Sequence, residues 1–289
     1  MKFPQASVFR FLLQSGDPKA VEAVVQTCRR MMDGGIHDQV MGGFHRYAVD
    51  RQWSVPHFEK MLYDQAQLME LYLDAWQMTG EDEFREIVKG VADYVLRELT
   101  HPEGGFYCAQ DAQSEGKEGK CFCWTEEELT ALLTADEMKL AREILGVSEK
   151  GNFIDQSDPD PLPNQNILSF TKPRKDLSES DKKSVAGIFK KLVVVRGKRV
   201  PPATDDKILA SWNGLMIGAM ARTGRVLSEP KYLKAARKAH NFIKERFWDA
   251  KSKRLAHRWR EGDRDDSAQA QSYLLFLAGT RKLYETSLQ

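Results

Sequence analysis

Gly34-Gly35-Ile36-His37-Asp38-Gln39-Val40 leads through a glycine-hinged loop into His57-Phe58-Glu59-Lys60-Met61-Leu62-Tyr63-Asp64. Apolar residues at helical spacing precede and follow this stretch, so it joins two predicted helices over about twenty residues. Helical proteins usually join helices with shorter loops, which makes this connection a candidate binding site. The alternative is an ordered hairpin whose three histidines and several carboxylates only satisfy one another.

Helical periodicity dominates the rest of the chain. Asp17-Pro18 predicts a helix start, and Gly34-Gly35 ends that helix. A second helix is expected from Pro56 to the residue before Gly80. Capping boxes that begin at Thr125 and Thr134 predict two short helices, and further helices are expected at 81–99, 180–195, 207–223, 229–248 and 267–286.

Short alternating segments at 43–47, 105–108 with 120–124, and 254–259 predict isolated hairpins rather than a central sheet. A repeated unit of helix, decorated loop and helix predicts stacked αα-hairpins. We therefore expect an all-α fold, a curved (α/α) toroid that forms a single domain over 1–289 and carries short β-hairpins on one face. The segment 151–175, rich in Asp, Pro and Asn, is expected to be a long loop within the toroid or, alternatively, an interdomain linker.

Composition excludes several classes of function. The 289 residues include 43 Lys and Arg against 42 Asp and Glu, a balance that favours neither nucleic acid nor a membrane surface as partner. The basic stretch from Lys190 to Arg199 is interpreted as a helix end. No apolar run reaches a membrane span and no signal peptide is evident, so we expect a cytoplasmic protein. The four cysteines are expected to be small buried hydrophobes, with a labile disulfide or a metal among Cys108, Cys121 and Cys123 as the alternative.

Five motifs resemble the YyaL / spermatogenesis-associated family. They are 34–39, 42–47, 55–64, 111–116 with 118–120, and 205–207 with 212–216, and the resemblance extends over roughly residues 2 to 286. Members of that family typically join a thioredoxin-like domain to a six-hairpin, glycosidase-like (α/α) toroid, similar to those of N-acylglucosamine and cellobiose epimerases. The resemblance implies the toroid part only, without the thioredoxin-like domain and truncated before the ring closes. It supplies a fold rather than a reaction.

The chain departs from the family pattern at four positions. Gln113 stands where the family usually has a second Asp, Met41 where it has Gly, Ala203 where it often has His, and Ser272 where it has Asp. A lost carboxylate beside Asp111 weakens a glycosidase mechanism with two carboxylates.

The candidate acid–base residues surround the long loop. His57 is expected at a helix N-terminus after Pro56, where the helix dipole would keep the imidazole neutral and able to take a proton near pH 7. Asp64 would lie two turns along the same helix face, and His45 and Tyr47 would share one side of a strand. A His45/His57 pair is thus a candidate for proton abstraction beside a sugar carbonyl. The alternative is that His57 only caps a backbone group.

Other polar residues are candidates for substrate contacts. Asp111 and Glu115 at a hairpin tip form either a carboxylate pair at a pocket rim or a solvated turn. One of Asp205 and Asp206 is expected to cap the next helix, and the other to bind sugar hydroxyls. Tryptophans near these groups suit sugar rings or, alternatively, belong to the core. The expected substrate-binding set is Trp53, Tyr47, Glu115, Trp212, Asn213 and Lys207.

Together with the resemblance, these residues predict a pocket for a sugar or sugar derivative, and the resemblance implies an isomerase, epimerase or glycosidase-like activity. His57 and His45 would transfer protons, while Asp64, Asp111 and Asp206 orient the substrate or balance charge. No metal or cofactor is expected, because no Gly-rich phosphate loop follows a strand and no histidine pair has ligand spacing. The alternative is a non-catalytic helical scaffold or binding module, linked to a thioredoxin-like partner.

Overall fold

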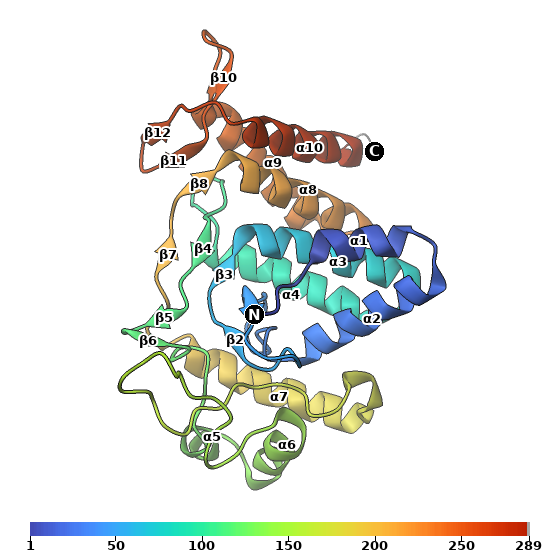
Figure 1. Cartoon of the computed structure of the whole chain (residues 1–289), viewed down its shortest axis with the longest axis vertical. Coiled ribbons are helices and arrows are strands. Elements are labelled where there is room, and N and C mark those ends of the chain that lie inside the picture. The colour runs from blue at the N-terminus through green and yellow to red at the C-terminus, as the bar shows by residue number, and fades with distance from the viewer. Residues whose placement is uncertain (288–289) are drawn as a thin grey trace. The chain divides into compact units, whose positions relative to one another are not determined.

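The structure is a computed structural model that describes residues 1–287 (Figure 1). These residues form two compact units, each described by itself. Unit 1 comprises Met1–Pro4, Gly16–Glu59 and Asp111–Ala203, and unit 2 comprises Gln5–Ser15, Lys60–Gln110 and the described chain from Thr204 onward. The single domain expected over 1–289 stays a prediction. No helix in the described chain combines the length and apolar character that a membrane crossing requires.

Unit 2 is built from helical hairpins. Its helices are α1 (Ala6–Gln14), α3 (Leu62–Thr79), α4 (Asp82–Glu98), α8 (Ala210–Val226), α9 (Pro230–Phe247) and α10 (Ala270–Ser287). Helices α3 and α4 form one hairpin and α8 and α9 another, while α8 also packs on α3 and α10. Helices α3 and α8 bury residues around most of their circumference, whereas α4 and α9 keep a polar face, as their apolar spacing requires.

Glycines set the close crossing of α8 and α10. A Cβ atom on Gly279 would collide with the carbonyl oxygen of Gly214, and a Cβ atom on Gly214 would collide with the carbonyl oxygen of Leu275. The backbones of the two helices therefore touch here, and only residues without a side chain fit.

Short antiparallel strands connect the loops at the helix ends of unit 2. They form a sheet of order β3-β4-β7, a sheet of order β12-β11-β8 and the pair β10-β9. Each strand has only two or three residues, so the strands anchor loops and do not form a core layer. The strands are β3 (Lys60–Met61), β4 (Ala109–Gln110), β7 (Thr204–Asp205), β8 (Ile208–Leu209), β9 (Trp248–Asp249), β10 (Arg254–Leu255), β11 (Arg258–Arg260) and β12 (Asp263–Asp265).

Unit 1 combines four helices with two strand pairs. Its elements are α2 (Pro18–Asp33), β1 (Tyr47–Ala48), β2 (Pro56–His57), β5 (Gln113–Ser114), β6 (Lys117–Glu118), α5 (Glu126–Leu132), α6 (Ala135–Leu145), a 3₁₀ turn at Arg174–Asp176 and α7 (Glu179–Arg196). One apolar cluster joins α5, α6 and α7 around Trp124, Leu145 and Ile188. Thr125 and Thr134 each form a complete capping box, so both predicted boxes are confirmed.

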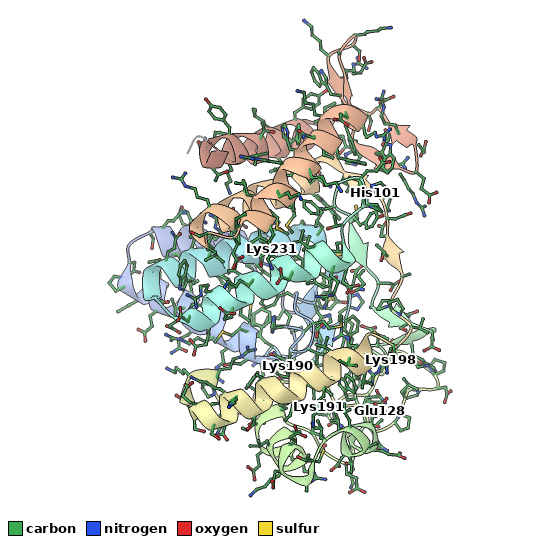
Figure 2. The ribbon with its side chains drawn as sticks, turned by 180° about the vertical axis from the view of Figure 1, so that it is seen from behind. His101, Glu128, Lys190, Lys191, Lys198 and Lys231 are labelled. Carbon is green, nitrogen blue, oxygen red and sulfur yellow. The ribbon has the colours of Figure 1, made fainter. Side chains whose placement is uncertain are left out.

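The basic stretch from Lys190 to Arg199 covers the last turns of α7 and the residues after it, as predicted. Figure 2 labels Lys190, Lys191 and Lys198 along this stretch. Lys191 Nζ lies 2.6 Å from Glu137 Oε2 on α6, so part of this positive charge holds two helices of unit 1 together.

Most helix predictions are confirmed to within a few residues, including the start of α2, where Asp17 accepts a hydrogen bond from the backbone N–H of Lys19. The segment 151–175 lies wholly within unit 1, so it is a loop and does not link the two units. Helix α1 was not among the predicted elements.

Two local predictions are wrong. The helix expected from Pro56 begins at Leu62, because Pro56–His57 pairs with Tyr47–Ala48 as strand and Lys60–Met61 pairs with β4. The hairpin expected between 105–108 and 120–124 does not form. Phe106 instead bridges to Thr100, and Trp124 bridges to Asn166.

Candidate functional site

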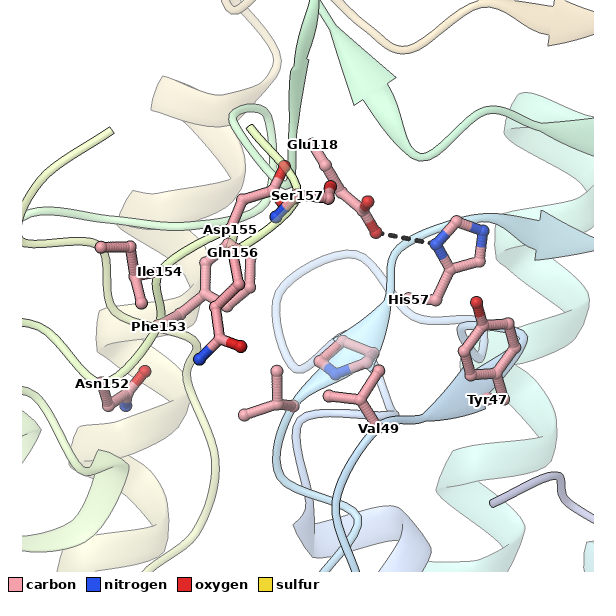
Figure 3. A pocket seen from close by; sticks show the side chains of 12 residues that line it. Tyr47, Val49, His57, Glu118, Asn152, Phe153, Ile154, Asp155, Gln156 and Ser157 are labelled. Atoms are coloured by element: carbon pink, nitrogen blue, oxygen red, sulfur yellow. Dashed lines mark hydrogen bonds and ion pairs between the residues drawn. The ribbon is translucent and has the colours of Figure 1, made fainter. Parts of the chain in front are cut away.

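A pocket of about 630 Å³ lies in unit 1. The β1–β2 pair and the β5–β6 hairpin supply one side, and the segment 152–157 supplies the other (Figure 3). His57 and Tyr47 come from the predicted site, whereas Glu118 and the segment 152–157 do not. The pocket is large enough for a small organic ligand.

His57 and Glu118 form an ion pair in this pocket. His57 Nδ1 lies 2.8 Å from Glu118 Oε1, and the backbone N–H of Phe58 donates to the same oxygen over 3.2 Å. Figure 3 marks the first of these contacts. Both side chains are largely buried, with 26% and 19% of their surfaces exposed. Within residues 1–287, Glu118 Oε2 has no hydrogen-bond partner and remains available to a ligand.

Strand register places these two groups. In the β1–β2 pair, Tyr47 stands opposite His57. Glu118 follows a two-residue turn, Glu115-Gly116, in which both residues have positive φ, 52° and 76°. Such turns match the twist of a hairpin. The turn therefore sets the register that places Gln113 opposite Glu118.

The pKa of His57 is raised from its ordinary value of 6.5, chiefly by the hydrogen bond to Glu118. Partial burial opposes this effect, and the charge of Glu118 and Glu59 adds to it. The predicted reason for a neutral imidazole is therefore wrong: His57 lies on a strand, outside the field of a helix N-terminus. The arrangement favours the imidazolium ion.

The Tyr47 ring and the contact with Glu118 orient the His57 ring. The Tyr47 ring stacks on it, with 4.9 Å between centroids and 22° between planes. Glu59 Oε2 lies 3.7 Å from His57 Nε2, beyond hydrogen-bond range, and is held by Arg46 Nη1 at 2.8 Å. The ring is thus fixed on one face and at Nδ1, while Nε2 remains able to donate to a ligand.

His45 and Trp53 are placed in the interior of unit 1. His45 is 2% exposed, its Nδ1 lies 2.8 Å from the carbonyl oxygen of Phe58, and Phe58 and Phe122 pack edge-on against its ring. Trp53 is also 2% exposed, and its carbonyl oxygen accepts from Ile36. Neither side chain lines the pocket, so the predicted His45/His57 pair is not assembled there.

Asp111 and Glu115 are exposed and outside this pocket. Asp111 Oδ1 accepts the backbone N–H of Gln113 over 3.1 Å, which is the turn bond of the alternative interpretation. Glu115 lies in the β5–β6 turn, 3.0 Å from Lys120 Nζ.

The remaining predicted residues belong to unit 2. Asp64 lies in the first turn of α3, not on a helix that carries His57, so the predicted His57–Asp64 stripe is wrong. Asp206 pairs with Arg260 at 2.6 Å, and Lys207 pairs with Asp205 at 3.1 Å. Neither aspartate caps α8, whose N-cap Leu209 forms no side-chain cap, so that prediction is also wrong.

Asn213 and Trp212 differ sharply in exposure. Asn213 is fully buried, and its amide group bonds the backbone of Phe106 in both directions and the carbonyl oxygen of Leu209. Its role in the structure is to hold the loop before β4. Trp212 is half-buried and lines a second pocket, wholly within unit 2.

Cysteines and metal ligands add nothing to the first pocket. All four cysteines are buried free thiols, as expected, and burial raises the pKa of Cys108 to about 12. Over the described part of the chain, no group of three or more His, Cys, Asp or Glu side chains is arranged to hold a metal ion.

Glu118 is the main residue that sequence reasoning missed. It belongs to one of the motifs quoted above, but its partner His57 is 61 positions away and the contact depends on two separate strand registers. The motif was the available signal. Periodicity gave no indication of the contact.

Comparison with known proteins gives the fold class first. The chain resembles the unsaturated glucuronyl hydrolase of Bacillus sp. GL1 with a TM-score of 0.54 and 10% identity, covering 97% of this chain and 53% of that one. The enzyme of the same name from Streptococcus agalactiae gives a TM-score of 0.50, 10% identity and coverages of 97% and 49%. The chain therefore has the (α/α) toroid fold of the six-hairpin glycosidase type, with short antiparallel strand pairs, as predicted.

Comparison of sequences then indicates the protein family. No family model matches. The chain is 38% identical to human spermatogenesis-associated protein 20 over 285 residues, which cover 88% of this chain and 36% of that protein. The Mus musculus protein of the same name is 34% identical over 325 residues, with coverages of 99% and 41%. The chain spans about two fifths of the length of these relatives, and the resemblance to the toroid part of the spermatogenesis-associated family is confirmed.

Proposed function

We propose that the pocket of unit 1 binds a sugar or sugar derivative, and that His57 and Glu118 act on it as proton donor and acceptor. The observation that carries this proposal is the ion pair at 2.8 Å, which lines a pocket of about 630 Å³. An acid–base pair in a concave pocket is a typical sign of a reactive site.

The pair can serve both ends of a proton transfer. Glu118 Oε1 is occupied by His57 and Phe58, so Oε2 takes a proton from the carbon next to a sugar carbonyl. His57 Nε2 donates a hydrogen bond to the carbonyl oxygen, where negative charge develops. His57 Nε2 protonates the former carbonyl oxygen of the resulting enediolate and then takes the proton of the adjacent hydroxyl. Glu118 returns its proton to the neighbouring carbon, which gives the isomeric sugar with no proton gained or lost overall. Glu118 thus replaces His45 as the second group of the predicted scheme.

The rest of the lining suits a polar ring. Gln156 lies on the segment opposite Glu118 and His57 (Figure 3), and its amide has no hydrogen-bond partner in residues 1–287. Val49 and Phe153 add apolar surface for the C–H face of a sugar. The shared fold also supports this substrate class, because the Bacillus hydrolase is described as responsible for the degradation of glycosaminoglycan.

The test is a proton-exchange screen. The whole chain is incubated in deuterated buffer with common aldoses, ketoses and disaccharides, and NMR follows deuterium uptake at the carbon next to the carbonyl. We expect exchange with at least one sugar, and its loss in Glu118→Gln and His57→Gln. Glu127→Gln is the matched control, since Glu127 is exposed on α5 and its side chain has no hydrogen-bond or ion-pair partner among the described residues. Exchange that survives Glu118→Gln refutes the mechanism.

A non-catalytic binding module is the second candidate. It is favoured by the burial of His45, Trp53 and Asn213, three residues of the predicted site that instead stabilise the fold. Under this alternative, sugars bind to the pocket without any exchange. A thioredoxin-like partner remains part of this alternative. It would have to bind without thiol exchange, since the four cysteines are all buried.

A further inference from the structure

Unit 2 contains a second pocket, of about 540 Å³, lined by residues from the first two turns of α1, α3, α8 and α10. We propose that this pocket binds an anionic monosaccharide, with the sugar ring against Trp212 and the negative group toward Arg10. The proposal does not rest on the function proposed above, because the two pockets share no residue.

An aromatic pair forms one wall of this pocket. Trp212 and Tyr63 meet edge to face, with ring centroids 4.8 Å apart and planes at 66°. Both rings are half-buried and pack on a cluster of Met61, Cys108 and Ala109. The wall is therefore fixed before a ligand arrives, and the apolar C–H face of a sugar ring can lie on it at little entropic cost.

Uncommitted polar groups complete the lining. Gln67 on α3, Gln271 on α10 and Ser7 on α1 all line the pocket. In the part of the chain that the structure describes, none of these three side chains has a hydrogen-bond partner. Two amides and a hydroxyl can together donate to and accept from several ring hydroxyls.

The charge of the pocket favours an anion. Among its lining residues, all of them described, Arg10 carries a positive charge and none carries a carboxylate. Arg10 contacts Glu70 at 2.9 Å and Asp74 at 2.7 Å, and Glu70 also contacts Arg222 and Lys282. This cluster of three cations and two carboxylates has one positive charge in excess. The N-termini of α1, α3 and α8, which lack side-chain caps, reinforce the preference.

Isothermal titration of the whole chain tests the proposal with glucuronate, glucose 6-phosphate and glucose. We expect at least one of the two anionic sugars to bind more tightly than glucose, and the comparison between them identifies the carboxylate or the phosphate as the favoured group. Trp212→Leu should weaken binding by about tenfold, because the stacking surface is lost. Gln271→Glu should weaken binding and Gln271→Lys should strengthen it, since Gln271 is exposed and a charge there leaves the core intact.

Gln14→Glu is the matched control. Gln14 is exposed at the end of α1 in the same unit and does not line the pocket, so the same charge change there should leave binding unaltered. Equal weakening by Gln14→Glu and Gln271→Glu would show only a general charge effect and overturn the proposal. The proposal is also overturned if neither anionic sugar binds, or if the Gln271 variants bind with the same affinity as the wild type. These outcomes do not depend on whether Trp212→Leu folds.

Discussion

A single carboxylate oxygen organises the candidate site of unit 1. Glu118 Oε1 accepts from both the His57 ring and the backbone of Phe58, which fixes the side chain and leaves Oε2 for a ligand. His57 alone was a reasonable candidate from the sequence. Its partner Glu118 could not be predicted, because the two residues are 61 positions apart in the chain and no local sequence pattern indicates their contact.

The raised pKa of His57 makes the stability of the protein depend on pH. The stabilisation from the pair is fully present below the unfolded pKa of about 6.5 and is lost as pH rises through the raised folded pKa. The free energy of unfolding should therefore fall by about 1 kcal/mol more in the wild type than in Glu118→Gln over that range, a small value because the pair is partly solvated.

Urea unfolding of both proteins between about pH 5.5 and about pH 8.5 measures this difference. Other groups that titrate in this range contribute equally to both proteins, so their contributions cancel when the two profiles are subtracted. Parallel profiles of the two proteins would contradict the assignment of the pKa shift to Glu118.

At the scale of elements, the crossing of α8 and α10 depends on glycine. Gly279→Ala would drive a Cβ atom into the carbonyl oxygen of Gly214, and backbone cannot move aside as a flexible side chain can. We expect a loss of about 3 kcal/mol in the free energy of unfolding, at the upper end for overpacking.

Gly90→Ala in α4 is the matched control for that change. A Cβ atom at Gly90 meets nothing within 4 Å, so alanine should stabilise the helix by about 0.5–1 kcal/mol. Denaturant unfolding of both variants distinguishes the two cases. If Gly279→Ala is also neutral or stabilising, the two helices do not approach as closely as described.

Helices were predictable and short strands were not, for one physical reason. Apolar spacing and caps are local, so α2, α5 and α6 could be placed from their own residues. Strand pairing depends on distant partners. The stretch that begins at Pro56 was expected to be helical. It is extended because β2 and β3 bond to β1 and β4, and β4 lies about fifty residues further on.

At the scale of the whole molecule, the sequence established the class of fold. Repeated helix–loop–helix units and long motifs both pointed to an (α/α) toroid, and the comparisons confirm it. The sequence did not reveal the division into two compact units, because contacts between segments such as Gly16–Glu59 and Asp111–Ala203 are set by packing and not by periodicity.

The thiols report on the integrity of both units. Cys28, Cys121 and Cys123 lie in unit 1 and Cys108 lies in unit 2. All are buried, and burial raises the pKa of Cys108 and Cys123, so we expect no rapid labelling by a thiol reagent at neutral pH. Unfolding in denaturant should expose all four thiols to the reagent. The absorbance of the coloured product of the labelling reaction gives the number of thiols that have reacted. A thiol that reacts at once in the native protein would contradict its placement in the interior.

The turn Glu115-Gly116 imposes a constraint on how this sequence can diverge. Side chains alternate between the two faces of a strand, so one residue added to this turn would direct Lys117 toward His57 and Glu118 away from it. A substitution of the exposed Gln113 would leave this register unchanged, but a one-residue insertion or deletion in the turn would separate Glu118 from His57. Homologues that lengthen this turn by one residue should thus lose the ion pair between His57 and Glu118 even while every motif residue is retained.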